Sequence, residues 1–149
     1  MSERLTRNGS DLRERAFEFA VLAIELHREI YRSDAPLRDV SRQFVKAATS
    51  VGANLEEADA AQSRADFVSK CTISLKESRE AHYWARLISR TAIDPAKGKS
   101  KPLVDESNQL VSILTTIVRR TRENDVVRDA PFDDDLSILN SQFSIPDNE

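Results

Sequence analysis

Apolar side chains recur every three or four residues along most of the chain, with polar residues between them. This is the period of an α-helix that buries one face. Within about 11–32, two sets of apolar residues repeat every seven positions: Leu12, Phe19 and Leu26, and Phe17, Ile24 and Tyr31. Together the two sets form one broad apolar face, so the pattern predicts a first helix over about 11–32.

A second apolar stripe runs over about 36–62 and passes without a break through the sequence SVGANLEEA. Its members are Leu37, Val40, Phe44, Ala48, Val51, Leu55 and Ala58. Gly52 and Asn54 are poor helix formers, but because the period continues through them we expect both inside the helix. Gly52 would permit close approach of a neighbouring backbone, or else it is a glycine tolerated on the outer face. Asn54 lies at the margin of the stripe, where its amide can donate and accept hydrogen bonds and fix helix register.

A third helix is predicted over about 64–93. Ser63 and Asp66 have the spacing of a capping box at its start. Asp94 ends the helix because it precedes Pro95, and a residue before proline disfavours helical geometry.

The loop DPAKGKSKP then leads to Pro102, and a fourth helix is predicted over about 102–123. Its apolar stripe contains Leu103, Leu110, Leu114 and Ile117. Because short connections join the first three helices, they should be antiparallel neighbours. The predicted fold is therefore all-α, an up-down-up-down antiparallel four-helix bundle over 11–124.

The third helix is unusual because it carries apolar groups on two faces. One face has mainly small side chains: Phe67, Cys71, Ser74, Ser78, Ala81, Ala85 and Ile88. The opposite face holds Ile73, Glu80, Trp84 and Leu87, with Lys76 and Tyr83 alongside. A helix that is apolar on two sides requires two partners. One is the bundle itself, and the second is another copy of the protein; the alternative is a single thick core with Trp84 at its edge.

Charged residues share this second face. Glu77, Glu80 and Trp84 are related by steps of three and four residues, so they lie together on the helix surface. If the face is an interface, Glu80 needs a partner, because an unpaired buried carboxylate is costly. The alternative is a solvated charged face.

Length and composition indicate one soluble domain. The chain has 149 residues, with three glycines and five prolines, too few for a loop-rich β-protein. The lone cysteine, Cys71, excludes an intramolecular disulfide and favours a reducing compartment. The first residues, MSERLTRNGSDLRER, do not resemble a signal peptide, and no apolar stretch is long enough to span a membrane. We therefore expect a cytoplasmic protein with no membrane partner.

Charge is distributed unevenly along the chain. The segment 125–149 contains seven acidic residues and one arginine, whereas the rest of the chain contains 18 acidic and 21 basic residues. Such a segment is typical of a disordered, solvated tail; the alternative is a tail that competes with nucleic acid for the basic surface of the body. Residues 1–10 are expected to form a flexible N-terminus.

No sequence pattern indicates catalysis. His27 and His82 lack the Glu-x-x-His spacing of a di-metal bundle. The GKS at 98–100 lacks the upstream glycine and the strand of a phosphate loop, so it predicts a flexible basic turn. Glu77 and Glu80 have neither a nucleophile nor oxyanion donors beside them, which favours paired structural carboxylates. We expect no enzyme activity, cofactor, metal or small-molecule substrate.

Two basic clusters are candidates for nucleic-acid contact. Their members are Lys97, Lys99 and Lys101, and Arg119, Arg120 and Arg122. They should lie at opposite ends of the fourth helix, about 30 Å apart, so that only an assembly would repeat each cluster around a rim and attract phosphates. The arginines also complement the dipole of a final helical turn, which is the simpler interpretation.

The segment SVGANLEEADAAQSRADFVSKCTISLKESREAHYWARLI resembles the four-helix bundle proteins related to the ribosomal-RNA intervening-sequence protein. The matching positions are Ser50, Asn54, Glu57, Ser63, Asp66, Phe67, Lys76, Glu77, Glu80, Tyr83 and Trp84. The resemblance implies an up-down bundle that assembles as a ring, commonly a pentamer. Some relatives are encoded within intervening sequences of 23S ribosomal RNA genes, and a related branch serves diversity-generating retroelements by binding reverse transcriptase and nucleic acid. The pI of about 5.5 departs from that of the basic relatives.

These observations lead to one expectation and one alternative. We expect a non-enzymatic, ring-forming bundle that acts as an assembly or adaptor module, with a protein or RNA as its partner. The alternative is a nucleic-acid-binding protein linked to ribosomal RNA or to a retroelement. The residues expected to fix how helices or subunits meet are Ser50, Gly52, Asn54, Glu57, Lys76, Glu77, Glu80, Tyr83 and Trp84.

Overall fold

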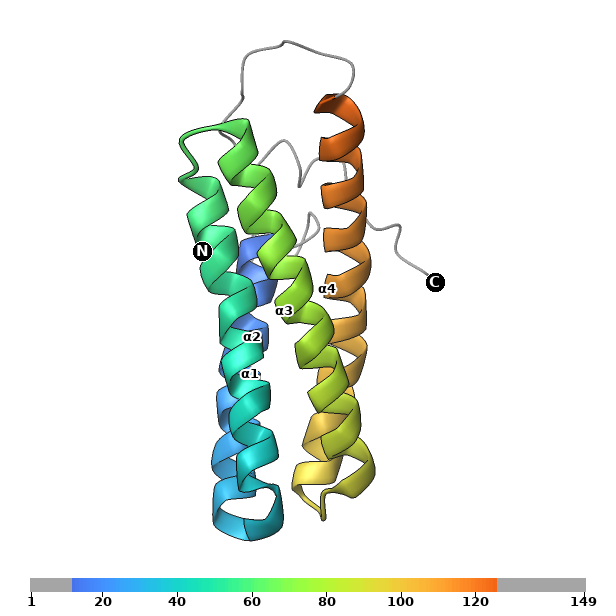
Figure 1. The fold of residues 1–149 in the computed structure, drawn as a ribbon. Coiled ribbons are helices and arrows are strands. Elements are labelled where there is room, and N and C mark those ends of the chain that lie inside the picture. Colours follow the sequence, from blue (N-terminus) through green and yellow to red (C-terminus); the bar gives the residue numbers. More distant parts are fainter. Residues whose placement is uncertain (1–11, 126–149) are drawn as a thin grey trace, which may run out of the picture.

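The computed structural model describes residues 12–125, which form four α-helices and one short 3-10 helix (Figure 1). The elements are α1 (Leu12–Ser33), η2 (Ala35–Leu37), α2 (Arg38–Asp59), α3 (Arg64–Thr91) and α4 (Ala96–Asp125). Consecutive helices run in opposite directions, which confirms the predicted all-α, up-down-up-down bundle. The predicted flexible N-terminus, 1–10, and all but the first residue of the predicted acidic tail, 125–149, lie outside the described residues.

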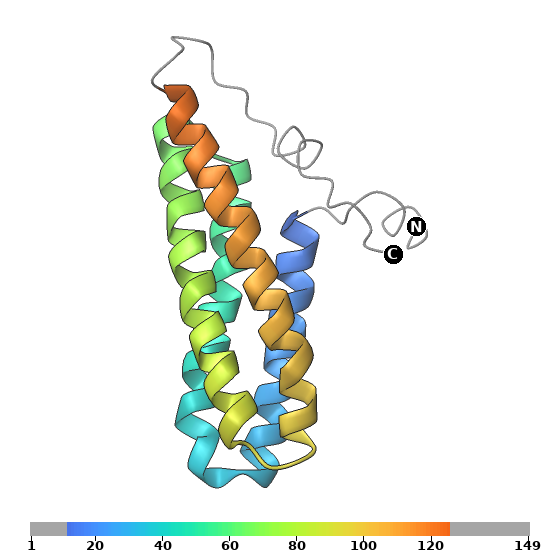
Figure 2. The ribbon, with the colours of Figure 1, turned by 90° about the vertical axis from the view of Figure 1, so that its right-hand side faces the viewer.

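The helices surround one core, each packing on its two neighbours around the bundle. α1 and α3 both contact α2 and α4. α1 and α3 therefore lie diagonally opposite each other in the bundle. Between α1 and α2, the rings of Phe19 and Phe44 meet edge to face with centroids 5.9 Å apart. Figure 2 shows that α4 crosses α1 at the lower end of the bundle and diverges from it toward the C-terminal end of α4.

The small face of α3 is buried as predicted. Cys71, Ser74, Ser78, Ala81 and Ala85 are all inaccessible to solvent or nearly so. The short side chains let α2 approach closely enough for the Ser74 hydroxyl to donate to the backbone oxygen of Val51, at 2.9 Å. This bond satisfies a hydroxyl that would be costly to bury alone.

The predicted cap at the start of α3 is also confirmed, but the Asp66 carboxylate accepts from Gln62 and not from the N-cap Ser63 as in a standard capping box. The backbone N–H of Asp66 donates to Ser63 Oγ at 3.1 Å, and the N–H of Gln62 donates to the Asp66 carboxylate at 3.4 Å. These bonds satisfy backbone donors that no helical carbonyl can reach.

The predicted start of the fourth helix, Pro102, is wrong. α4 begins at Ala96, and Pro102 lies inside it. Asp94 supports this start, because its carboxylate accepts from the N–H of Gly98 in the first turn at 3.2 Å. The GKS at 98–100 is therefore helical, and the flexible basic turn predicted there does not exist.

The two connections at the lower end of the bundle are joined to each other. Asp34, between α1 and η2, is buried, and its carboxylate accepts from the N–H of Ile93 at 3.2 Å. Because Ile93 lies between α3 and α4, one hydrogen bond links the two hairpins. Across residues 12–125, no helix combines the length and the apolar character that crossing a membrane requires.

Candidate functional site

The outward face of α3 keeps apolar groups that the bundle does not cover. We call it the α3 outer face, and it comprises Ile73, Lys76, Glu80, Tyr83, Trp84 and Leu87. Tyr83 is 56% exposed and Ile73 37% exposed, whereas Trp84 and Leu87 are half-buried. The prediction of a two-sided α3 is confirmed in this respect: one face is in the core and the other is open.

The two aromatic rings of the α3 outer face are held in place. Tyr83 and Trp84 meet edge to face with centroids 5.0 Å apart. The indole N–H of Trp84 donates to Glu80 Oε1 at 3.1 Å. One hydrogen-bond donor to Glu80 is thus supplied by α3 itself, and the two rings form an apolar surface with a carboxylate at its edge.

Glu77 lies beside this face in a different environment from Glu80. Partial burial raises the pKa of its carboxyl, the charge of Glu80 raises it further, and Lys46 of α2 opposes the shift. Lys76 makes no ion pair within the described part of the chain, so the i,i+4 pairing with Glu80 allowed by spacing is not formed.

The α2 residues predicted to act with α3 have separate roles. Gly52 faces α1: a Cβ added there would lie 3.6 Å from atoms of Ala16. The Asn54 amide donates to the backbone oxygen of Ser50 in its own helix, at 2.8 Å, so in this structure it does not fix register between helices. Glu57 forms an ion pair with Lys70 of α3, and this hydrogen bond raises the pKa of Lys70.

The two histidines are occupied structurally. His27 Nδ1 lies 2.7 Å from Ser41 Oγ, and His82 Nδ1 lies 2.9 Å from Ser107 Oγ. Each serine hydroxyl also lies within bonding distance of a carbonyl oxygen in its own helix. When the serine donates to that oxygen, the Nδ1–H of the neutral histidine is the donor and Nε2 is an acceptor. No group of three histidine, cysteine, aspartate or glutamate residues placed to hold a metal occurs among residues 12–125.

The two predicted basic clusters lie toward opposite ends of α4, as expected. The lysines Lys97, Lys99 and Lys101 are in its first turns rather than on a loop. Lys99 pairs with Glu29 of α1 at 3.2 Å. At the other end, Arg122 donates to Thr72 of α3 at 3.4 Å. Part of each cluster is therefore used to hold α4 against its neighbours.

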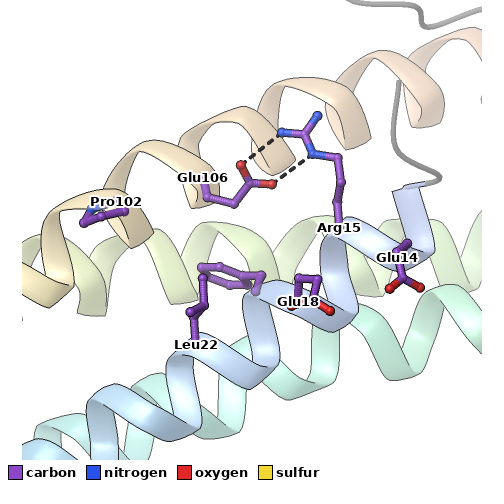
Figure 3. Close-up of a pocket in the computed structure, with 7 residues that line it drawn as sticks. Glu14, Arg15, Glu18, Leu22, Pro102 and Glu106 are labelled. Atoms are coloured by element: carbon purple, nitrogen blue, oxygen red, sulfur yellow. Dashed lines mark hydrogen bonds and ion pairs between the residues drawn. The ribbon is translucent and has the colours of Figure 1, made fainter. Parts of the chain in front are cut away.

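A groove between α1 and α4 was missed by the sequence analysis. It has a volume of about 400 Å3 and is lined by Glu14, Arg15, Glu18, Phe19, Leu22, Pro102 and Glu106. Figure 3 shows Arg15 of α1 and Glu106 of α4 pointing toward each other at the edge of the groove. The Arg15 guanidinium donates two hydrogen bonds to the Glu106 carboxylate, at 2.9 and 3.1 Å. Since the partners are 91 positions apart in sequence, only the three-dimensional fold reveals the pair.

A second missed feature lies at the turn between α1 and α2. We call it the arginine–tyrosine cluster, and it comprises His27, Arg28, Tyr31, Arg32, Arg38 and Arg42. The guanidinium of Arg38 lies 4.6 Å from the centroid of the Tyr31 ring, and a hollow of about 370 Å3 is lined by His27, Arg28, Tyr31 and Arg32. The spacing of the arginines, 28 with 32 and 38 with 42, was a signal in the sequence that could have found it.

Comparisons with known proteins agree with this architecture. The family model described as 23S rRNA-intervening sequence protein matches residues 10–116. A solved structure from Bacteroides thetaiotaomicron, described as a protein with unknown function from the S23 ribosomal protein family, is 33% identical, with a TM-score of 0.64. The alignment covers 72% of this chain and 97% of that one. Among curated proteins, no match is found.

Proposed function

The chain belongs to the 23S rRNA-intervening sequence protein family, and on this premise we propose that it is a non-enzymatic, ring-forming bundle. It acts as an assembly or adaptor module in the cytoplasm. The observation that carries this proposal is the α3 outer face, because the helix already packs on both its neighbours and still leaves two ordered aromatic rings accessible.

The chemistry of the α3 outer face suits a protein interface. Tyr83 is 56% exposed and Trp84 is partly exposed, so both can bury further apolar area, and both residue types are enriched where partners meet. Lys76 and Glu80 at its edge supply charges that set orientation and exclude wrong partners. A second copy of this chain can gain apolar burial there. The Trp84 N–H supplies one hydrogen bond to Glu80, and the charge of that carboxylate would need a cationic partner on the second copy.

A ring requires two different surfaces on each subunit, because only head-to-tail contacts close around a rotation axis. α1 lies diagonally across the bundle from α3 and exposes its own apolar residues. Phe17, which is 60% exposed, and Ile24 are one heptad apart on α1. This second surface supports a head-to-tail arrangement, and the expected number of five subunits rests on the family resemblance.

The charge on the α3 outer face provides the test. We expect Glu80→Ala to lower the assembled fraction, measured by sedimentation velocity at micromolar concentration, because it removes the acceptor of the Trp84 N–H. The matched control is Glu56→Ala, which removes an exposed carboxylate on α2. Equal assembly by the two variants would contradict the assignment of this face.

Nucleic-acid binding is the second candidate. It is favoured by Lys97 and Lys101, which are exposed and form no ion pair within residues 12–125. The test is the salt dependence of RNA binding, compared between the full chain and a chain lacking residues 125–149. Absence of binding at low salt by the shorter chain would remove this candidate.

A further inference from the structure

The arginine–tyrosine cluster concentrates positive charge at a cost to local stability. Arg28 and Arg32 are four residues apart on α1, and Arg38 and Arg42 are four apart on α2. Like charges at this spacing repel each other on one helix face. The hairpin formed by α1, η2 and α2 then brings both pairs to the same turn.

Two carboxylates of this region, Glu29 and Asp39, are engaged, whereas Glu25, three residues before Arg28, forms no ion pair within residues 12–125. Glu29 is shared between Arg32, at 3.4 Å, and Lys99, at 3.2 Å. Asp39 pairs with Arg42 at 2.9 Å. Arg28 has no carboxylate partner within residues 12–125, and Arg38 uses its Nε–H on the backbone oxygen of Tyr31, at 2.9 Å. Positive charge therefore remains available to an external anion.

An aromatic platform lies among these charges. Tyr31 is 50% exposed, and its ring is held by Arg38 at 4.6 Å and by the tilted ring of His27 at 5.8 Å. When His27 donates through Nδ1 to Ser41, its Nε2 is a hydrogen-bond acceptor beside the platform. Guanidinium groups, an exposed ring and a hollow of about 370 Å3 are the elements that recognise a nucleotide.

We propose that the arginine–tyrosine cluster binds a nucleotide unit, with the base stacked on Tyr31 and the phosphate held by Arg28 and Arg32. Guanidinium groups bind phosphate through two parallel hydrogen bonds. Aromatic side chains stack on any of the nucleic-acid bases, so this contact does not require a particular nucleotide sequence. The shallow hollow and the spread of four arginines over two helices favour a single strand as the source, since each further phosphate adds to binding. This site differs from the lysine and arginine clusters of α4 and does not depend on assembly.

The test is fluorescence anisotropy of a labelled oligouridylate with the full chain at low salt. We expect Tyr31→Leu to weaken binding by about fivefold or more, the lower end of what base stacking contributes. Tyr31→Phe retains the ring and should bind within about twofold of the wild type, since the stacking surface is kept. Tyr31→Leu must also retain the wild-type circular dichroism. If Tyr31→Leu binds as tightly as the wild type, the proposal is wrong.

A variant that removes one charge distinguishes binding at the arginine–tyrosine cluster from general electrostatic attraction to the protein. Arg28→Gln should weaken binding and lower the slope of log K against log salt by about 0.7, the value for one phosphate contact on a single strand. The control, Arg79→Gln, removes an equally exposed arginine from α3 and should leave both quantities unchanged. Equal effects of the two variants would show that the strand binds by general electrostatic attraction and not at the arginine–tyrosine cluster. That result would overturn the proposal.

Competition identifies the ligand chemistry and its source. Displacement of the oligonucleotide by adenosine monophosphate would show that a free nucleotide is sufficient, and displacement only by unlabelled oligonucleotide would assign a strand. Either result supports a nucleotide site. If polyglutamate, which has charge but no bases, displaces the strand as effectively as unlabelled oligouridylate, base recognition is excluded and the proposal fails.

Discussion

Gly52 lies inside α2 and faces Ala16 of α1. An added Cβ would be in ordinary van der Waals contact, 3.6 Å from the nearest Ala16 atoms, and the backbone φ of Gly52 is not positive. The close approach expected from the sequence does occur, but it leaves room for a methyl group. Glycine is therefore not required here by the packing of the isolated chain.

Gly52→Ala should raise the free energy of unfolding by about 1 kcal/mol, which is the difference in helix propensity between the two residues. The measurement is urea denaturation followed by circular dichroism. Ala53→Gly, at the exposed neighbouring position, is the control and should lower stability by about the same amount. A loss of stability in Gly52→Ala would mean that α1 cannot accommodate the methyl group.

His27 links stability to pH. Partial burial, and after it the charge of Arg42, lowers the pKa of His27 below 6.5. The unfolded chain therefore takes up this proton at a higher pH than the folded chain does. The contribution of His27 to stability is complete above about pH 6.5 and is lost as the pH falls through the lowered folded pKa.

His27→Gln should remove this part of the pH dependence, because glutamine can still donate to Ser41 but does not titrate. The free energy of unfolding is to be measured for both proteins at about pH 7.5 and about pH 5.5, on either side of the ordinary histidine pKa. The wild type should lose more stability than the variant on acidification. An equal loss would show that His27 is not responsible.

Cys71 should be chemically inert in the folded protein. Burial raises the pKa of its thiol to about 12, and only the thiolate is the reactive form. Because it is the single cysteine of the chain, any reaction with a thiol reagent reports this residue. We expect no reaction in native buffer and complete reaction in denaturant; rapid native reaction would contradict the burial of the small face of α3.

At the scale of elements, the sequence was sufficient for helix number, direction and most ends. The unbroken period of apolar residues correctly predicted that the second helix continues through Gly52 and Asn54. The spacing of Ser63 and Asp66 correctly predicted the start of α3. The start of α4 was misplaced because DPAKGKSKP was taken as a loop, whereas α4 begins at Ala96. The Asp94 carboxylate supports this start, and its bond to Gly98 is a local geometry that residue type alone does not specify.

Ser63→Ala should lower the free energy of unfolding by about 1 kcal/mol, the usual contribution of an N-terminal cap. The loss arises because Asp66 N–H would no longer have the Ser63 hydroxyl as acceptor. Ser69→Ala, at an exposed position in the interior of α3, is the control and should be close to neutral. If both changes have the same effect, the cap does not contribute to the stability of α3.

At the scale of the whole molecule, the sequence predicted which face of α3 is open but not how its groups are arranged. Periodicity indicated a second apolar face, whereas the bond between Trp84 and Glu80 needed side-chain geometry. The α1–α4 groove and the arginine–tyrosine cluster depend on residues from different helices, such as Arg15 with Glu106 and Tyr31 with Arg38. Such pairings follow from helix rotation and packing, which a single sequence does not fix.

The outward faces of α1 and α3 give the molecule two different apolar surfaces on opposite sides of one bundle. This arrangement is suited to repeated head-to-tail contact between identical chains. The arginine–tyrosine cluster, near the turn that joins α1 and α2, would then be repeated once per subunit. We expect variants of Glu80 to change assembly and variants of Tyr31 to change nucleotide binding.

The most direct test of the central claim is the mass of the full-length, wild-type protein in solution, measured by light scattering after size exclusion at micromolar concentration. We predict a single discrete assembly with a mass several times that of one chain, five times if the family resemblance holds for this protein. A strict monomer over the whole micromolar range would contradict the assignment of the α3 outer face as an assembly surface.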